Sequence, residues 1–98
     1  MRYIIRFTEE ARMHLRQLSA GERKRALNRI EAVLGDEPTR ITRNLKLLRP
    51  NPLAHYELRV GALRVFFNVE ERRASVLVLS VGRKEGAGLW IGGREVRI

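Results

Sequence analysis

The fold is decided by His55–Lys84, which reads HYELRVGALRVFFNVEERRASVLVLSVGRK. Apolar and polar residues alternate through its first half, a pattern typical of β-strands. A two-residue hairpin loop at Gly61-Ala62 would pair Val60 with Leu63 and align the residues on either side of the loop. A second turn is predicted at 71–72. The stretch therefore predicts three consecutive antiparallel strands.

This register sorts the side chains of the first two strands onto two faces, because alternate residues of a strand point to opposite sides. One face is apolar or aromatic and holds Tyr56, Leu58, Val60, Leu63, Val65 and Phe67. The other face holds His55, Glu57, Arg59, Arg64, Phe66 and Asn68. A slip of one residue would mix the two sets, so the pattern specifies the register strongly. The third strand, 74–81, is apolar on both faces, as a central strand is.

Two helices are predicted before these strands, and each begins at a hydroxyl residue. Thr8 precedes Glu9-Glu10, and Ser19 opens a Ser-Ala-Gly-Glu capping box. Apolar residues at helical spacing give each helix one buried stripe. The stripes are Ala11, Leu15 and Leu18 in the first helix, and Ala26, Leu27, Ile30, Val33 and Leu34 in the second. The short break between the helices predicts an antiparallel helical hairpin.

Together these elements predict an α+β fold of two layers. A small antiparallel sheet of three to four strands, mixed at the N-terminal strand Arg2–Phe7, packs on the N-terminal helical hairpin. No linker divides the chain, so residues 1–98 are expected to form a single domain. Gly92-Gly93 predicts a small C-terminal hairpin, or else a tail that orders only with a partner.

Composition narrows the function classes. The formal net charge is +9, with 44% hydrophobic and 32% charged residues, which predicts a folded protein with a polyanionic partner or substrate. The chain has no cysteine and only two distant histidines, so we expect no metal site and no cofactor. No apolar run approaches the ~20 residues of a membrane span. The expected location is the cytoplasm.

One pair of arginines stands out in the predicted register. Arg59 lies directly opposite Arg64, and like charges in opposed positions are unfavourable. Either Glu57 and another acid neutralise the pair, or the pair awaits an anion such as phosphate. Arg83 and Lys84 emerge at the same end of the sheet. These cations would then ring one concave end.

Three further residues have two readings each. His55 could act as a general acid or base, or be a partly exposed histidine without a role. Glu57 could act as a base or serve as an ion-pair partner of the arginines. Trp90 could stack on a nucleobase or be a packing residue.

In this order of elements the chain resembles the RelE/ParE superfamily of bacterial toxins, the toxin halves of type II toxin–antitoxin pairs. The resemblance covers about residues 2–91. It rests on the spaced fragments YELRVG at 56–61, RVFF at 64–67 and VLVLSVGRKE at 76–85, with Leu45-Lys46-Leu47 matching a Lys-Leu element of the family. The resemblance implies an antiparallel sheet packed on two helices.

The resemblance also implies two possible activities. RelE-type members are ribosome-dependent endoribonucleases that cut mRNA, whereas ParE-type members act on DNA gyrase by protein binding and cut no RNA. Both are neutralised by a cognate acidic antitoxin. A third reading is a basic RNA-binding domain without catalysis. We predict the first activity, a metal-independent mRNA endoribonuclease.

Site residues carry over from the family one by one. Arg64 matches its phosphate-stabilising arginine, and Arg83 and Lys84 match the basic pair after the last strand. Trp90 stands where other members have a tyrosine. His55 and Glu57 stand where RelE has two lysines, and either is a candidate base. The predicted catalytic residues are therefore Arg64, Lys84, Arg83, His55 and Glu57, with Lys46, Arg59 and Trp90 as nucleic-acid-binding residues.

Overall fold

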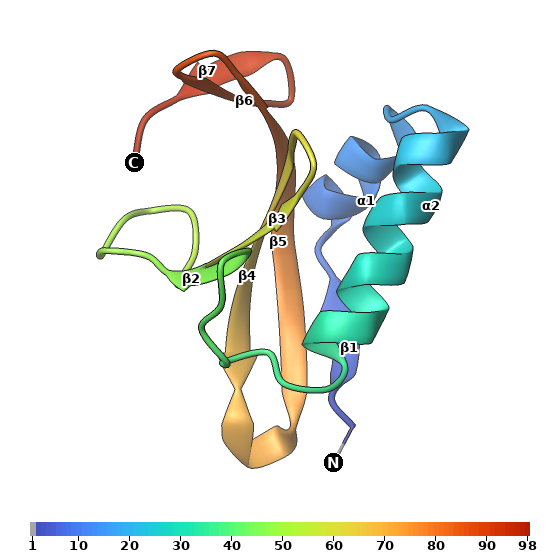
Figure 1. The fold of residues 1–98 in the computed structure, drawn as a ribbon, viewed down its shortest axis with the longest axis vertical. Coiled ribbons are helices and arrows are strands. Elements are labelled where there is room, and N and C mark those ends of the chain that lie inside the picture. Colours follow the sequence, from blue (N-terminus) through green and yellow to red (C-terminus); the bar gives the residue numbers. More distant parts are fainter. Residues whose placement is uncertain (1) are drawn as a thin grey trace.

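The computed structural model describes residues 2–98, in which two helices lie against one face of a curved sheet (Figure 1). The helices are α1 (Glu9–Arg16) and α2 (Ala20–Arg29), and α2 continues into a π-helical turn at Ile30–Leu34. The strands are β1 (Ile4–Phe7), β2 (Leu45–Leu47), β3 (Tyr56–Val60), β4 (Leu63–Glu70), β5 (Ser75–Glu85), β6 (Gly88–Ile91) and β7 (Arg94–Val96). A 3₁₀ turn at Glu71–Arg73 joins β4 to β5. No helix within residues 2–98 is long and apolar enough to cross a bilayer.

The sheet is larger than predicted. It has seven strands in the order β2-β3-β4-β5-β6-β7, with β1 pairing with β5. The prediction of three to four strands left out β2, which is only three residues long, and did not join the predicted C-terminal hairpin, now β6 and β7, to the sheet. The mixed N-terminal strand is confirmed, since β1 runs parallel to the first half of β5. The second half of β5 pairs antiparallel with β6 instead.

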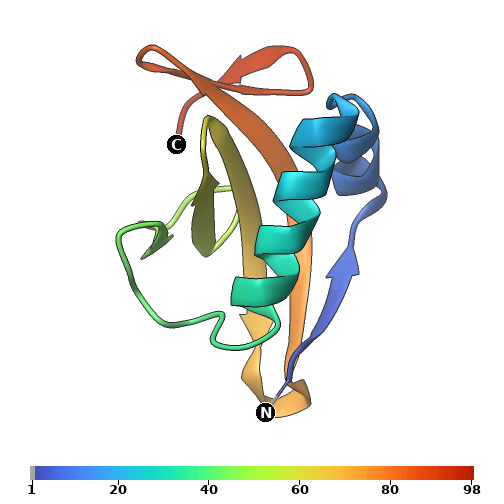
Figure 2. The same cartoon turned by 45° about the vertical axis from the view of Figure 1, so that its right-hand side comes forward.

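The predicted register of the first hairpin is confirmed throughout. Val60 pairs with Leu63, Arg59 with Arg64, and Tyr56 with Phe67. The rings of Tyr56 and Phe67 stack with centroids 5.3 Å apart. The apolar face of the hairpin joins the main core under the two helices (Figure 2). The α+β class is thus confirmed, with helices on one face only.

The helices begin where the sequence predicts. The Thr8 hydroxyl accepts a hydrogen bond from Ala11 N at 3.0 Å, and the Ser19 hydroxyl accepts one from Glu22 N at 3.2 Å. One residue of the second stripe was misassigned: Leu27 is 38% exposed. The buried stripe runs at four-residue spacing through Ala26, Ile30 and Leu34, which leaves Leu27 at its margin.

A second, smaller core lies on the face opposite the helices. Phe66, predicted on that open face, lies there and is fully buried by the apolar side chains packed around it. The residues around Phe66 come from the 48–54 segment, from β5 and from the C-terminal hairpin: Ala54 and Leu89 are buried, and Leu48, Leu53, Leu79, Ile91 and Val96 pack against them. The C-terminal residues therefore form an ordered β6–β7 hairpin around Gly92-Gly93.

Candidate functional site

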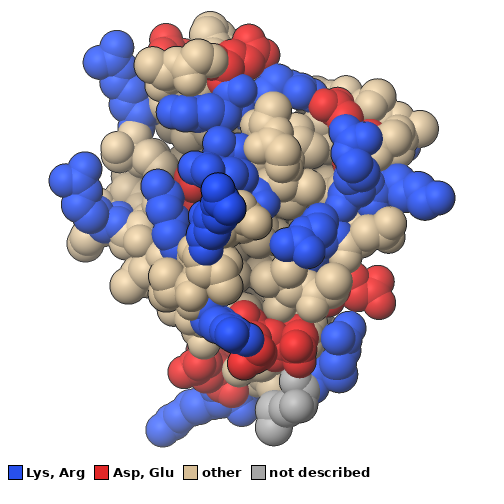
Figure 3. All heavy atoms as spheres, in the orientation of Figure 1, with Lys and Arg blue, Asp and Glu red and all other residues tan. Residues whose placement is uncertain are grey.

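A cleft of about 760 Å³ opens beside the second core, between the β2–β3 side of the sheet and the C-terminal hairpin. We call it the cationic cleft. Lys and Arg side chains gather over this part of the surface in Figure 3. The charged residues that line the cleft are six cations and two acids: Lys46, Arg49, Arg59, Arg64, Lys84, Arg97, Glu57 and Glu95. The excess of cations gives the cleft a positive potential, which attracts anions.

Strand pairing explains why residues distant in sequence meet in the cleft. Residues paired across a sheet point to the same face, and so do alternate residues of one strand. Lys46 pairs with Glu57, and Arg59 pairs with Arg64, two residues further along the hairpin. Lys84 lies two residues beyond the partner of Arg64 on β5. The sheet therefore sends all five side chains to one face.

Arg64 forms the floor of the cleft. Its partner on β5 is Gly82, where β6 approaches so closely that an added Cβ would lie 2.7 Å from Trp90 O. The residue is 8% exposed, and its Nη1 donates to Gly61 O at 2.8 Å and to Leu63 O at 2.9 Å. Among residues 2–98, Nη2 donates no hydrogen bond. Burial, followed by the nearby Arg59 charge, lowers the pKa of Arg64 against the opposing effect of Glu57. A buried guanidinium with a free donor binds an anion strongly.

Glu57 compensates only part of this charge. A carboxylate oxygen of Glu57 lies 3.9 Å from Arg64 Nε and 3.9 Å from Lys46 Nζ. These distances allow ion pairing but exceed those of a hydrogen bond. Arg59 has no ion pair within residues 2–98. Glu57 therefore offsets part of the charge of Arg64 and Lys46, whereas the charge of Arg59 has no acidic partner among the described residues.

Several solved structures are similar to this chain. The intact Escherichia coli RelBE toxin–antitoxin complex contains a chain with 32% identity, covering 85% of this chain and 98% of that one, at a TM-score of 0.64. The isolated E. coli RelE toxin has 30% identity, covering 87% of each chain, at a TM-score of 0.65. A chain of the Mycobacterium tuberculosis RelBE2 toxin–antitoxin complex has 25% identity, covering 86% of this chain and 93% of that one, at 0.75.

The chain belongs to the RelE family of toxins. Identities of 30% and above over nearly the full length of both chains decide this, and the resemblance predicted from the sequence is confirmed. No protein-family model matches the sequence, and no curated protein matches it either. The family relationship therefore rests on fold and sequence identity together.

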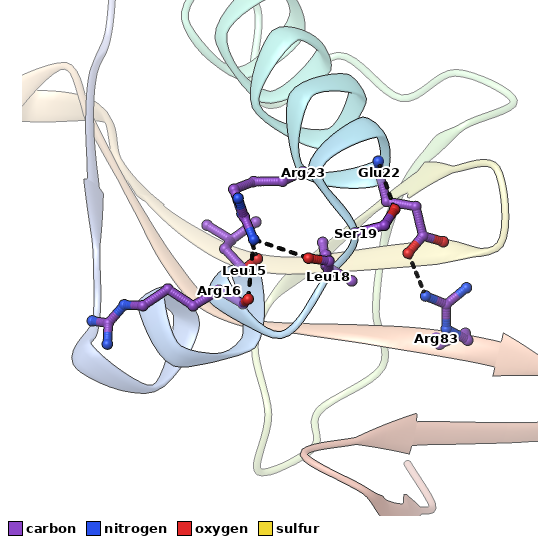
Figure 4. Close-up of polar contacts among 7 residues, drawn as sticks. All are labelled: Leu15, Arg16, Leu18, Ser19, Glu22, Arg23 and Arg83. Carbon is purple, nitrogen blue, oxygen red and sulfur yellow. Dashed lines mark hydrogen bonds and ion pairs between the residues drawn. The ribbon is translucent and has the colours of Figure 1, made fainter.

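In this RelE-family toxin, Arg83 lies on the opposite face from its neighbour Lys84. It pairs with Leu63 of the apolar face, because adjacent residues of a strand alternate. Its Nη2 donates a 2.8 Å hydrogen bond to Glu22 on α2 (Figure 4). This bond lowers the pKa of Glu22 and raises that of Arg83. The expectation that Arg83 and Lys84 share one concave end is corrected: β5 continues to Glu85, so alternation separates them.

Trp90 and His55 also lie outside the lining of the cationic cleft. Trp90 pairs with Arg83 and lines a smaller hollow of about 320 Å³ between α1 and the C-terminal hairpin. His55 is exposed directly before β3, where its backbone N donates to Asn68 Oδ1 at 2.7 Å. The structure therefore brings together Lys46, Glu57, Arg59, Arg64 and Lys84 and leaves three predicted site residues elsewhere.

Two cations of the cleft were missed by the sequence reasoning. Arg49 lies in the 48–54 segment and Arg97 follows β7, and both line the cleft. No periodic pattern could have placed them, since both lie outside the strands. The sequence signal for both was weak: each directly follows an apolar residue, Leu48 or Val96. Within residues 2–98, no three His, Asp or Glu side chains gather as metal ligands would.

Proposed function

We propose that this toxin is a metal-independent endoribonuclease that cuts mRNA on the ribosome in the cytoplasm. The observation that carries the proposal is Arg64, a nearly buried guanidinium with a free donor at the floor of the cationic cleft. A phosphodiester is the anion that such a fork of donors fits. The relationship to the RelE family supports the same substrate class.

The proposed reaction is a transesterification, in which the phosphoryl group moves from the 5′-oxygen of the next nucleotide to the adjacent 2′-hydroxyl. The 2′-oxygen attacks phosphorus while the bond to the leaving 5′-oxygen breaks, giving a cyclic phosphate and a free 5′-hydroxyl. The 2′-proton passes to a base, and the 5′-oxygen receives a proton from an acid. The extra negative charge on the phosphoryl oxygens is stabilised by fixed cations of the protein.

The residues of the cleft fit these steps. Arg64 stabilises the phosphoryl charge and Arg59, directly opposite, holds the same phosphate. Lys84, whose Nζ donates to Ala87 O at 3.2 Å, protonates the leaving oxygen. Glu57 accepts the 2′-proton, with Lys46 holding its carboxylate in place. His55, Arg83 and Trp90 lie outside the cleft, so the proposal gives them no chemical step.

We also propose that a cognate acidic antitoxin neutralises the toxin. Similar chains occur in RelBE toxin–antitoxin complexes from E. coli and M. tuberculosis. A toxin with a net charge of +9 attracts a partner of opposite charge. A short acidic protein encoded beside this chain should co-purify with it and restore growth when both are expressed.

The test is primer-extension mapping of transcripts after induced expression. The wild type should arrest translation and leave cuts at fixed positions within codons, and Arg64→Ala should lower the cutting about 10²-fold or more. Arg72→Ala, an exposed arginine in the turn after β4, is the matched control and should cut like the wild type. Intact mRNA with an SOS response would instead indicate a gyrase target. Cuts that persist in Arg64→Ala would reject the proposed site.

A further inference from the structure

The cationic cleft has two rims that each carry an unpaired arginine. Arg49 lies on the rim formed by the 48–54 segment, and Arg97 lies on the rim formed by the C-terminal hairpin. Both side chains are exposed, and neither makes an ion pair or a side-chain hydrogen bond within residues 2–98. They differ in this from Arg64, which is nearly buried at the floor between them.

The second core fixes the backbone beside each of these arginines. Arg49 directly follows Leu48, and Arg97 directly follows Val96, and both apolar residues pack in the cluster around Phe66. The two rims therefore share one small core, although they come from segments more than forty residues apart. The backbone at each arginine is thus anchored by its apolar neighbour.

Asn51 adds a second restraint on the first rim. Its Oδ1 accepts hydrogen bonds from Leu53 N at 2.7 Å and Ala54 N at 3.2 Å. Its Nδ2 donates to Arg49 O at 2.7 Å and to Ala54 O at 3.0 Å. These four bonds close the segment into a compact turn. The backbone of Arg49 is therefore held in place before any ligand binds, which lowers the entropy lost on binding.

We propose that Arg49 and Arg97 bind the two phosphates on either side of the phosphate held by Arg64, so that the cleft takes a single RNA strand of at least three consecutive phosphates. This inference rests on the proposed function. Exposed arginines on rims bind backbone phosphates without reading sequence, whereas the floor positions the phosphate that reacts. A cleft of about 760 Å³ has the size of a site for a small ligand or a short chain segment.

The test compares binding of two uncleavable ligands, 2′-O-methylated RNAs with unphosphorylated ends. A dinucleotide has one phosphate and a tetranucleotide has three. Wild type should bind the tetranucleotide more tightly than the dinucleotide, and Arg49→Ala/Arg97→Ala should lose that gain while binding the dinucleotide like the wild type. Each single variant should lower the salt slope of tetranucleotide binding by about 0.7, as one lost phosphate contact on a single strand does.

Two further variants separate a phosphate contact from general charge. Arg49→Lys/Arg97→Lys keeps both charges and should keep the tetranucleotide gain, while Arg72→Ala removes a distant charge and should change neither ligand. The inference is overturned if the double alanine variant keeps the gain, or if Arg72→Ala loses as much. Because the ligands cannot be cut, this result is independent of the cleavage test. If the double alanine variant keeps the tetranucleotide gain while Arg64→Ala loses cutting, the inference about Arg49 and Arg97 is rejected and the proposed function is kept.

Discussion

The two faces of the sheet treat neighbouring cations in opposite ways. On the helix face, Arg83 meets Glu22 at 2.8 Å, and Arg23 donates to three backbone carbonyls, so both charges have internal partners. On the cleft face, Lys84 and Arg59 make no ion pair within residues 2–98. The comparison teaches that net charge alone does not locate a binding site. The difference between the faces lies in the acids: Glu22 forms a hydrogen bond with Arg83 at 2.8 Å, whereas Glu57 lies 3.9 Å from Arg64 and no acid pairs with Arg59 among the described residues.

The largest expected difference is between Lys84→Ala and Arg83→Ala. Lys84→Ala should slow single-turnover cleavage of ribosome-bound mRNA about 10²–10⁴-fold, because it removes the proposed acid. Arg83→Ala should leave the cleavage rate within about twofold and lower stability modestly, because its partner Glu22 lies on α2. Equal losses of rate in the two variants would break the distinction between the faces.

Phe66 and Phe67 extend the comparison to packing. Both are fully buried, Phe67 in the core under the helices and Phe66 in the core that joins the cleft rims. Phe66→Leu and Phe67→Leu should each destabilise the protein by about 1–3 kcal/mol in urea unfolding. Only Phe66→Leu should also weaken tetranucleotide binding by the folded protein. Weaker tetranucleotide binding in Phe67→Leu as well would contradict the idea that the core around Phe66 alone positions the rims of the cleft.

Arg23 is a cation whose expected role is to stabilise the fold. Its guanidinium donates to Leu15 O at 2.9 Å, Arg16 O at 3.0 Å and Leu18 O at 2.9 Å, at the end of α1 (Figure 4). Arg23→Ala should cost about 1–3 kcal/mol of stability, since it leaves carbonyls without donors. Arg25→Ala, on the exposed side of α2, should change stability by less than about 0.5 kcal/mol. Neither variant should alter RNA binding.

The smallest expected effect is a pH dependence at His14. Its Nδ1 accepts a 3.1 Å hydrogen bond from Val81 N, which requires a neutral ring. Burial lowers the pKa of His14 below its usual 6.5, against the opposing charge of Glu10. The unfolded chain therefore binds a proton at His14 more readily than the folded protein does. The contribution of the neutral ring to the free energy of unfolding is complete above pH 6.5 and declines as the pH falls towards the folded pKa. Urea unfolding at pH 7.5 and 5.5 should show a smaller decline in the free energy of unfolding for His14→Gln than for the wild type.

The sequence predicted what short-range patterns encode. Alternation around Gly61-Ala62 gave the register that sets Arg59 against Arg64, and hydroxyl caps gave both helix starts. It predicted only some of the cations that share the cleft. The length of β5 decides the faces of Arg83 and Lys84, and strand ends are poorly encoded. Arg49 and Arg97 meet through packing around Phe66, a long-range contact that no local pattern specifies.

Pairing of β1 with β5 has a consequence for synthesis of the chain. Thr8 donates its hydroxyl to Leu79 O at 2.8 Å, across 71 residues, so the first strand cannot dock until nearly the whole chain has been translated. Lys84 and Arg97 are made later still. A nascent chain therefore emerges from the ribosome without an assembled cationic cleft, because the strands and side chains that form it extend to the C-terminal end of the chain.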